Sequence, residues 1–449
     1  MQELAGFPYV ELVFNKDAAI VDRSGFEELL AELSDGGAAD VLVFAHGWNN
    51  DIADAKRLYT GLATQLRAVS DASPPAQLGT RRLALVGVFW PSKRFTDEGL
   101  IAGGSAGTGP SAVEAQLEAR LDELKGAFDA DDADDRLARA KALVPVLEDD
   151  PAARDEFVEL VRGALGDRAT SDEDDASADY DTLPGREALE RLKAPIVTRR
   201  REDSQGGAAG GAATGQRRRE SDEGAARGES RTGFGAAAQR YLNLATYYQM
   251  KDRAGLIGES GLNPRLRELR ERAPAARLHL VGHSFGGRLV TAATVGAPGA
   301  PAVEPDSVTL LQAAFSHYGF AEDYEPGKNG FFRRMLSDHM TRGPVLVTHS
   351  TRDSAVGSAY PLASRLAGFA ASALGDKNDR YGGIGRNGAQ KTPEAITGWL
   401  GRTGTTYAFK AGHIHNLNAD TVILDHSDIR GEQVAYAILS AVASPTPGP

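Results

Sequence analysis

The strongest constraint on the fold of this chain is a repeated alternation of short apolar runs with helical patterns. Runs rich in Val, Leu, Ile and Phe are bounded by turn residues and cover residues 9–14, 40–47, 82–90, 277–283, 307–315, 344–350 and 420–426. Helical patterns lie between most of them, at residues 26–33, 52–66, 288–295, 359–373 and 429–442. Strands buried on both faces that alternate with helices pair in parallel through crossovers. We therefore expect an α/β fold with an open, mostly parallel, doubly wound sheet.

One region interrupts this alternation, because residues 100–233 contain no convincing strand. Part of it carries apolar residues at helical spacing, first at Val113, Leu117, Leu121, Leu124 and Phe128 and again at Phe157, Leu160, Val161 and Leu165. Each set predicts a helix with one apolar stripe that must be covered. A Gly-rich and charged stretch follows, which cannot bury enough apolar surface to offset the entropy of the chain.

These observations predict how the chain is divided. Residues 1–99 and 233–444 form the α/β core, residues 100–198 a helical insertion, residues 199–232 a disordered linker and residues 445–449 a flexible tail. Long connections that leave the carboxyl edge of such a sheet lie over that edge, so the insertion is a candidate cap.

Composition narrows the classes of partner. The formal net charge is −12, which repels rather than gathers the phosphates of a nucleic acid, and we expect no nucleic-acid partner. The chain has no cysteine, which excludes disulfides and thiolate chemistry. No apolar run approaches the roughly 18 residues that span a bilayer, and the first residues do not resemble a secretory signal. We expect a cytoplasmic protein without a transmembrane segment.

The stretch LHLVGHSFGGRLV (278–290) contains the pattern Gly-x-Ser-x-Gly between a predicted strand and a predicted helix. In this context the pattern predicts a nucleophile elbow, a strained turn that exposes a serine at the carboxyl edge of a sheet. The glycines on either side of Ser284 have no side chain, so neighbouring backbone segments can pass close to the turn. The helix behind it directs N–H groups and a positive dipole end toward any oxyanion that forms there.

A serine needs a base, and the base needs an orienting carboxylate. Asp353 follows the predicted strand 344–350 and has the expected place for the carboxylate. In this architecture the base follows the acid along the chain, which leaves His413, His415 and His426 as candidates. We favour His426, because it ends the last apolar run just before the final helix.

The remaining site residues follow from the early stretch VFAHGWNN (43–50). An oxyanion hole needs two backbone donors, and we expect them to be the amides of Phe285 and Trp48. His46 is interpreted as a brace for this loop. Asp425, His426 and Asp428 are a weak signal for a metal site, and we expect neither a metal nor a cofactor.

The motifs HGW after an early strand, GHSFGG, an Asp after a later strand, and HSDI near the end resemble the α/β-hydrolase superfamily. More narrowly, VFAHGWNN, VFWPSK, YYQMKDRAGLIG and GHSFGGRLV resemble a bacterial group of serine-esterase-like hydrolases. The resemblance covers residues 9–99 and 233–443 and implies an α/β-hydrolase fold. It implies a triad of Ser284, Asp353 and His426, with the amides of Phe285 and Trp48 as oxyanion donors. Residues 100–233 depart from the minimal fold.

The expected function is that of a serine hydrolase that cleaves a carboxylic ester through an acyl-enzyme intermediate, with a small-molecule or lipid-like ester as substrate. Transfer of the acyl group to an acceptor other than water, or cleavage of an amide or thioester, would use the same residues. A hypothesis from another class is a non-catalytic scaffold that binds a protein partner through the insertion.

Overall fold

The computed structural model describes residues 1–34, 40–48, 50–92, 110–166, 180–193, 233–353, 366, 377 and 380–445. The predicted disordered linker 199–232 and the predicted helix 359–373, except Leu366, lie outside the described residues. So does most of the predicted tail.

A ten-stranded sheet forms the centre of the described part of the chain, with β3 paired on β2 beside the main path. Its order is β1-β2-β5-β4-β6-β7-β8-β10-β9. The strands are β1 (Gln2–Leu4), β2 (Phe7–Phe14), β3 (Ile20–Asp22), β4 (Asp40–Ala45), β5 (Leu83–Phe89), β6 (Arg277–His283), β7 (Ser307–Leu311), β8 (Val345–His349), β9 (Ala395–Trp399) and β10 (Ile414–Asn418). β1 and β3 pair antiparallel with β2, and the other pairs are parallel. The expected α/β fold with a mostly parallel sheet is confirmed.

The last predicted strand is wrong. Residues 420–426 form turns, and the strand beside β8 is β10, whose sequence IHNLN lacks a continuous apolar run. Val422 and Ile423 donate backbone hydrogen bonds to the carbonyl of Ala419, so the chain reverses there instead of extending. Only Ile423 of this apolar run is fully buried, and Leu424 is exposed.

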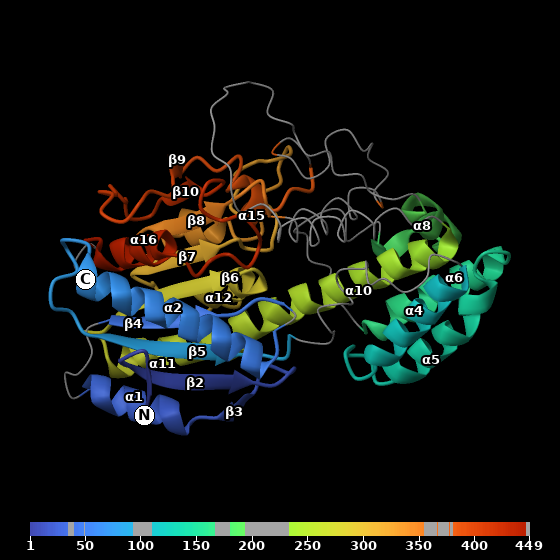
Figure 1. Cartoon of the computed structure of the whole chain (residues 1–449), viewed down its shortest axis with the longest axis horizontal. Helices are drawn as coiled ribbons and strands as arrows, with labels where there is room; N and C mark the ends of the chain where they lie inside the picture. Colours follow the sequence, from blue (N-terminus) through green and yellow to red (C-terminus); the bar gives the residue numbers. More distant parts are fainter. Residues whose placement is uncertain are drawn as a thin grey trace, which may run out of the picture.

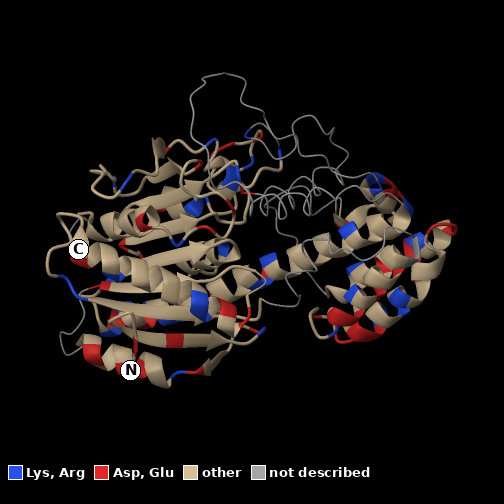
Figure 2. Ribbon diagram, viewed as in Figure 1, with Lys and Arg blue, Asp and Glu red and all other residues tan. Residues whose placement is uncertain are grey.

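Helices cover both faces of the sheet (Figure 1). One face packs with α2 (Ile52–Ala72) and α16 (Glu432–Ala443) in a single apolar cluster. The other face packs with α1 (Ser24–Ser34), α10 (Phe234–Leu256), α11 (Asn263–Arg272) and α12 (Phe285–Val295), and the π-helix η2 (Ile257–Leu262) joins α10 to α11. The central strands carry almost no charged side chains, as Figure 2 shows, because both of their faces are covered. Two short helices, α13 (Arg334–Ser337) and α15 (Ile384–Asn387), lie in the later connections.

The described part of the insertion is a small helical bundle. It contains α4 (Pro110–Glu123), α5 (Ala133–Leu143), the 3₁₀ turn η1 (Val144–Val146), α6 (Pro151–Ala164) and α8 (Gly185–Leu192). α4, α6 and α8 pack on α10, and α5 packs on α4 and α6. Figure 1 shows the bundle at the end of α10 that lies away from the sheet. The other end of α10 packs on α12. A role of the bundle as a cap stays a prediction.

The connections reverse direction between β4 and β6, which are neighbours in the sheet. β4 leads through α2 to β5 on one side, whereas β6 leads through α12 to β7 on the other. In open α/β sheets, ligands bind outside the carboxyl ends of strands at such a switch point. The topology therefore directs attention to the loops after Ala45 and His283.

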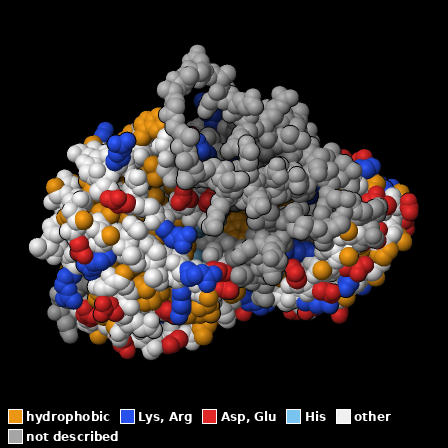
Figure 3. Space-filling model, in the orientation of Figure 1, with side chains coloured by type: hydrophobic (Ala, Val, Ile, Leu, Met, Phe, Trp, Pro, Cys, Tyr) orange, Lys and Arg blue, Asp and Glu red, His pale blue; other side chains and the backbone are white. Residues whose placement is uncertain are grey.

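Figure 3 shows apolar side chains on the visible face in small groups among polar and charged ones, which is ordinary for a folded domain. No helix in the described ranges has the length and apolarity needed to cross a bilayer.

Candidate active site

The register of β4 and β6 brings two loops together at the carboxyl edge. Ala45 lies opposite Gly282, so the residues that follow each strand run side by side. Gly47 then lies against Ser284, and a Cβ added to Gly47 would be 2.6 Å from the Ser284 Cβ and 3.1 Å from its Oγ. The predicted oxyanion turn and the predicted nucleophile are therefore in contact.

Ser284 occupies the strained conformation that the motif predicts. Its φ is 56° and its ψ is −125°, between the end of β6 and the first residue of α12. This left-handed region is costly for a residue with a side chain, by about 1–3 kcal/mol. A Cβ at Gly282 would collide with the carbonyl of Gly286, and one at Gly286 with the carbonyl of Ala45. Only glycine at both positions permits the turn.

Asp353 and His426 form a hydrogen-bonded pair. His426 Nδ1–H donates to Asp353 Oδ2 at 2.8 Å, across 73 residues of sequence. The Asp353 side chain has no exposed surface, whereas 18% of the His426 side chain is exposed, so solvent reaches the imidazole and not the carboxylate. This arrangement leaves His426 Nε2 as the nitrogen available for proton transfer.

The environment of His426 favours its protonated form. Burial lowers the pKa of His426, but the charge of Asp353, the hydrogen bond to it and the charge of Asp425 together raise it above the ordinary value of 6.5. An imidazole that is held by a carboxylate in this way is a stronger base than a free one.

His46 braces the turn after β4, as the sequence interpretation expects. Its Nδ1–H donates to the carbonyl of Gly47 at 2.9 Å, and its Nε2 accepts a long hydrogen bond from the amide of Trp90 at 3.4 Å. The indole of Trp90 stacks on the His46 ring and donates to the His46 carbonyl at 3.0 Å. Burial lowers the pKa of His46 to about 4, so the ring is neutral and keeps this tautomer.

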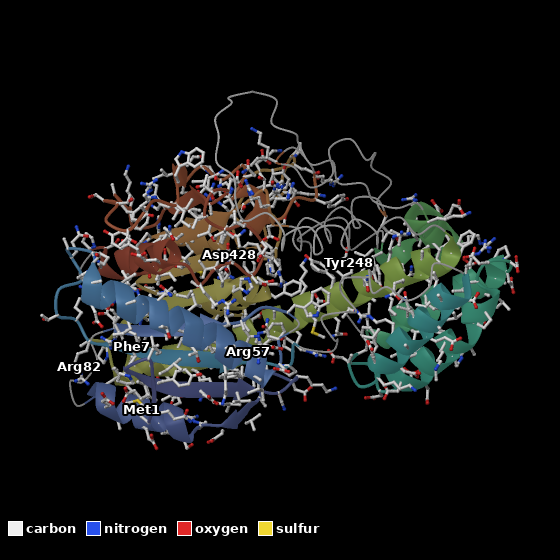
Figure 4. The ribbon with its side chains drawn as sticks, viewed as in Figure 1. Met1, Phe7, Arg57, Arg82, Tyr248 and Asp428 are labelled. Atoms are coloured by element: carbon white, nitrogen blue, oxygen red, sulfur yellow. The ribbon has the colours of Figure 1, made fainter. Side chains whose placement is uncertain are left out.

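The side chains of the two predicted oxyanion residues lie close to each other and to a tyrosine of α10. The ring of Phe285 lies 6.1 Å from that of Trp48 and 5.2 Å from that of Tyr247, which belongs to α10. Tyr248, labelled on α10 in Figure 4, contacts Tyr247 in turn. Phe285 is the first residue of α12, so its N–H has no carbonyl one turn earlier in the helix.

The two other candidate bases, His413 and His415, lie at the amino-terminal ends of the strands, away from Ser284. His413 precedes β10 and donates from Nδ1 to the carbonyl of Ala411 at 3.0 Å, while His415 accepts from the amide of Lys410 at 2.9 Å. The site edge lies at the far end of β10, beside His349. With about 3.3 Å per residue, the far end of β10 is about 10 Å from His415 and about 17 Å from His413.

The carboxylates of Asp425 and Asp428, near His426, accept hydrogen bonds from backbone amides of the same loop. Asp425 accepts from the amide of Ser427, and Asp428 accepts from the amide of Leu424. In the described part of the chain, no group of three or more His, Asp or Glu side chains is arranged to hold a metal ion.

Two residues in this site were missed by sequence reasoning. His283 precedes the serine, so the expected order of serine, acid and base excludes it as the base, yet its Nε2–H donates to the carbonyl of His426 at 2.9 Å. Gln312, just after β7, donates from Nε2 to Asp353 Oδ2 at 3.3 Å and to the carbonyl of Gly385 at 2.9 Å. For His283 the available signal was its place beside Ser284. For Gln312 the signal was a polar residue in an otherwise apolar run.

Comparison of the chain with protein-family models, with curated proteins and with solved structures finds no match.

Proposed function

We propose that this protein is a serine hydrolase with an α/β-hydrolase fold that cleaves a carboxylic ester through an acyl-enzyme intermediate. One observation carries the proposal. The hydrogen-bonded pair of His426 and Asp353 is joined, through the His426 carbonyl, to the residue that immediately precedes a serine with a φ of 56°. The resemblance of the motifs to serine-esterase-like hydrolases supports the same function.

In the proposed mechanism, Ser284 Oγ attacks the ester carbonyl carbon while His426 Nε2 takes the hydroxyl proton. When the tetrahedral intermediate collapses, the bond to the alcohol oxygen breaks and His426 returns the proton to that oxygen. Water then attacks the acyl carbon, His426 accepts a proton from the water, and the Ser284 oxygen leaves with that proton. Asp353 holds the imidazole in one tautomer and stabilises the imidazolium.

The backbone amides of Phe285 and Trp48 are the proposed donors to the oxyanion. The N-terminus of α12 adds a positive dipole end at the same place. A preorganised donor of this kind typically contributes about 10²–10³ in rate. The brace around His46 keeps the turn that carries Trp48 in position before substrate arrives.

A fluorophosphonate probe tests the proposal directly. Such a probe is expected to label the folded wild-type protein, with the adduct at Ser284 by peptide mapping, and not to label Ser284→Ala. A panel of p-nitrophenyl esters graded by acyl-chain length then defines the substrate class, and added alcohols, amines or thiols reveal acyl transfer. A folded protein that neither reacts with the probe nor cleaves any ester of the panel would contradict the proposal and favour a non-catalytic scaffold.

A further inference from the structure

His283 is a buried titratable residue that the mechanism above does not use. Its Nε2–H donates to the carbonyl oxygen of His426 at 2.9 Å, and the centres of the two rings are 4.8 Å apart. Since a carbonyl can only accept, the bond assigns the Nε2–H tautomer. His283 Nδ1 is buried, and no hydrogen-bond partner for it lies among the described residues.

We propose that His283 is a positioning residue, which holds the general base His426 in register with the nucleophile Ser284. The inference rests on the proposed function, because it assigns a role within the same reaction. In this role the side chain of His283 does not touch the substrate, and it affects the reaction only by holding His426 in place.

The first argument is mechanical. His426 lies in a loop without helix or strand, between β10 and α16. Asp353 holds its ring from the loop after β8, and His283 holds its backbone from the end of β6. Two restraints from different strands fix both the ring and the carbonyl of one residue. Because His283 and Ser284 are consecutive, with Cα atoms about 3.8 Å apart, the base is tied to the same backbone as the nucleophile.

The second argument is electrostatic. Burial, and then the neighbouring His426, lower the pKa of His283 to about 3, while the hydrogen bond to the His426 carbonyl and the charge of Asp353 oppose this shift. His283 therefore stays neutral when His426 becomes an imidazolium. A protonated His283 would repel that imidazolium and would place a buried Nδ1–H without an acceptor. Among the described residues, Asp425 is the second charged group that raises the pKa of His426, and the neutral His46 is the second histidine that lowers the pKa of His283.

The test compares two variants of similar size, His283→Gln and His283→Met. Glutamine keeps an N–H donor near the end of the side chain, whereas methionine keeps only the volume. We expect His283→Met to lose about 10- to 100-fold in kcat/KM for a p-nitrophenyl ester, mainly through kcat, because a buried carbonyl loses its donor. His283→Gln should recover most of this loss. The rate of fluorophosphonate labelling should follow the same order.

A second readout separates positioning from simple loss of stability. If His426 moves away from Asp353, its pKa falls, so the acidic limb of kcat/KM should shift to lower pH in His283→Met and much less in His283→Gln. A folded His283→Met enzyme with wild-type kcat/KM and an unshifted limb would overturn the inference. Failure of the proposed function looks different, because the wild-type protein itself would then be unlabelled and inactive.

Nitrogen NMR on the wild-type protein decides the question if His283→Met does not fold. His283 should be the neutral Nε2–H tautomer at pH 7 and should remain neutral at pH 5, while His426 titrates. A His283 that is the Nδ1–H tautomer, or that is protonated at pH 5, would also overturn the inference.

Discussion

Gly47 lies so close to Ser284 that the space for a Cβ on Gly47 is already occupied by the serine side chain. The two residues come from neighbouring parallel strands, and the glycine precedes the residue whose amide is the proposed oxyanion donor. The close approach makes the position of the oxyanion turn and the position of the nucleophile depend on each other.

Gly47→Ala should therefore lower kcat by about 10²-fold or more, because the turn must move away from Ser284 and carry Trp48 with it. Gly25→Ala is the matched control. A Cβ at Gly25 would make an ordinary contact of 3.5 Å with Val10, so this variant should keep wild-type activity. Steady-state kinetics on one ester compares the two. Equal activities in Gly47→Ala and Gly25→Ala would contradict the proposed place of the oxyanion hole.

Ser284→Ala should abolish turnover while the stability holds, because it removes the nucleophilic hydroxyl and keeps the Cβ, so the backbone conformation of the elbow does not change. A second serine that is linked to a histidine and an aspartate provides a control for this variant. Ser307 Oγ lies 2.8 Å from His279 Nδ1, and His279 Nε2 lies 2.9 Å from Asp40 Oδ1. These three residues are buried near the amino-terminal ends of β4, β6 and β7, whereas Ser284 lies at the carboxyl ends.

Ser307→Ala should thus keep its activity and lose about 1–3 kcal/mol of stability, since a buried imidazole nitrogen loses its donor. Urea unfolding and ester kinetics on both variants check this contrast. An inactive Ser307→Ala with an active Ser284→Ala would reverse the assignment.

His426→Ala should reduce activity about as far as Ser284→Ala does, because the members of a triad act as a unit. His413→Ala and His415→Ala should stay within a few-fold of the wild type, since both lie at the other end of β10. The three variants are compared by kcat/KM and by the rate of fluorophosphonate labelling. Loss of labelling in His413→Ala with normal labelling in His426→Ala would show that the base is misassigned.

The dependence of kcat/KM on pH should reflect the protonation of His426. The base must be neutral to accept a proton, and its pKa is raised, so kcat/KM should fall as the pH drops below that raised pKa and be level above it. Asp425→Asn removes one of the charges that raise the pKa, and its amide oxygen can still accept from Ser427. The acidic limb should then move to lower pH, by less than about one unit. A limb that moves to higher pH would contradict this account.

Arg253 joins α10 to the segment between α4 and α5 of the helical bundle. Its guanidinium is buried and donates to Asp129 at 2.6 Å and to the carbonyls of Ala127 and Pro91. Arg253→Met should cost about 1–3 kcal/mol, because the buried carbonyl of Ala127 loses its donor, whereas the partly exposed Asp129 keeps its hydrogen bond from Gln249. Arg57→Met changes an exposed arginine of α2, labelled in Figure 4, and should cost less than about 0.5 kcal/mol. Urea denaturation measures both, and similar values would contradict the structural role of Arg253.

The sequence alone determined that the sheet is mostly parallel and that a tight turn places Ser284 between β6 and α12, because both features depend on local patterns. The run 277–283 is apolar enough to be buried on both faces, and the glycines around Ser284 are required by backbones only a few residues apart or on the adjoining strand. The order of Ser284, Asp353 and His426 along the chain also came from the pattern, and the structure places the last two within hydrogen-bond distance.

Only the tertiary structure decided which segments complete the sheet and what holds the base. Residues 414–418 form β10 because they pair with β8 on one side and β9 on the other, whereas the more apolar residues 420–426 turn away and bury only Ile423 in full. The hydrogen bond from His283 to His426 joins residues that are 143 positions apart. No local propensity encodes a contact of this kind, since it exists only after the packing of separate strands has brought their ends to one edge.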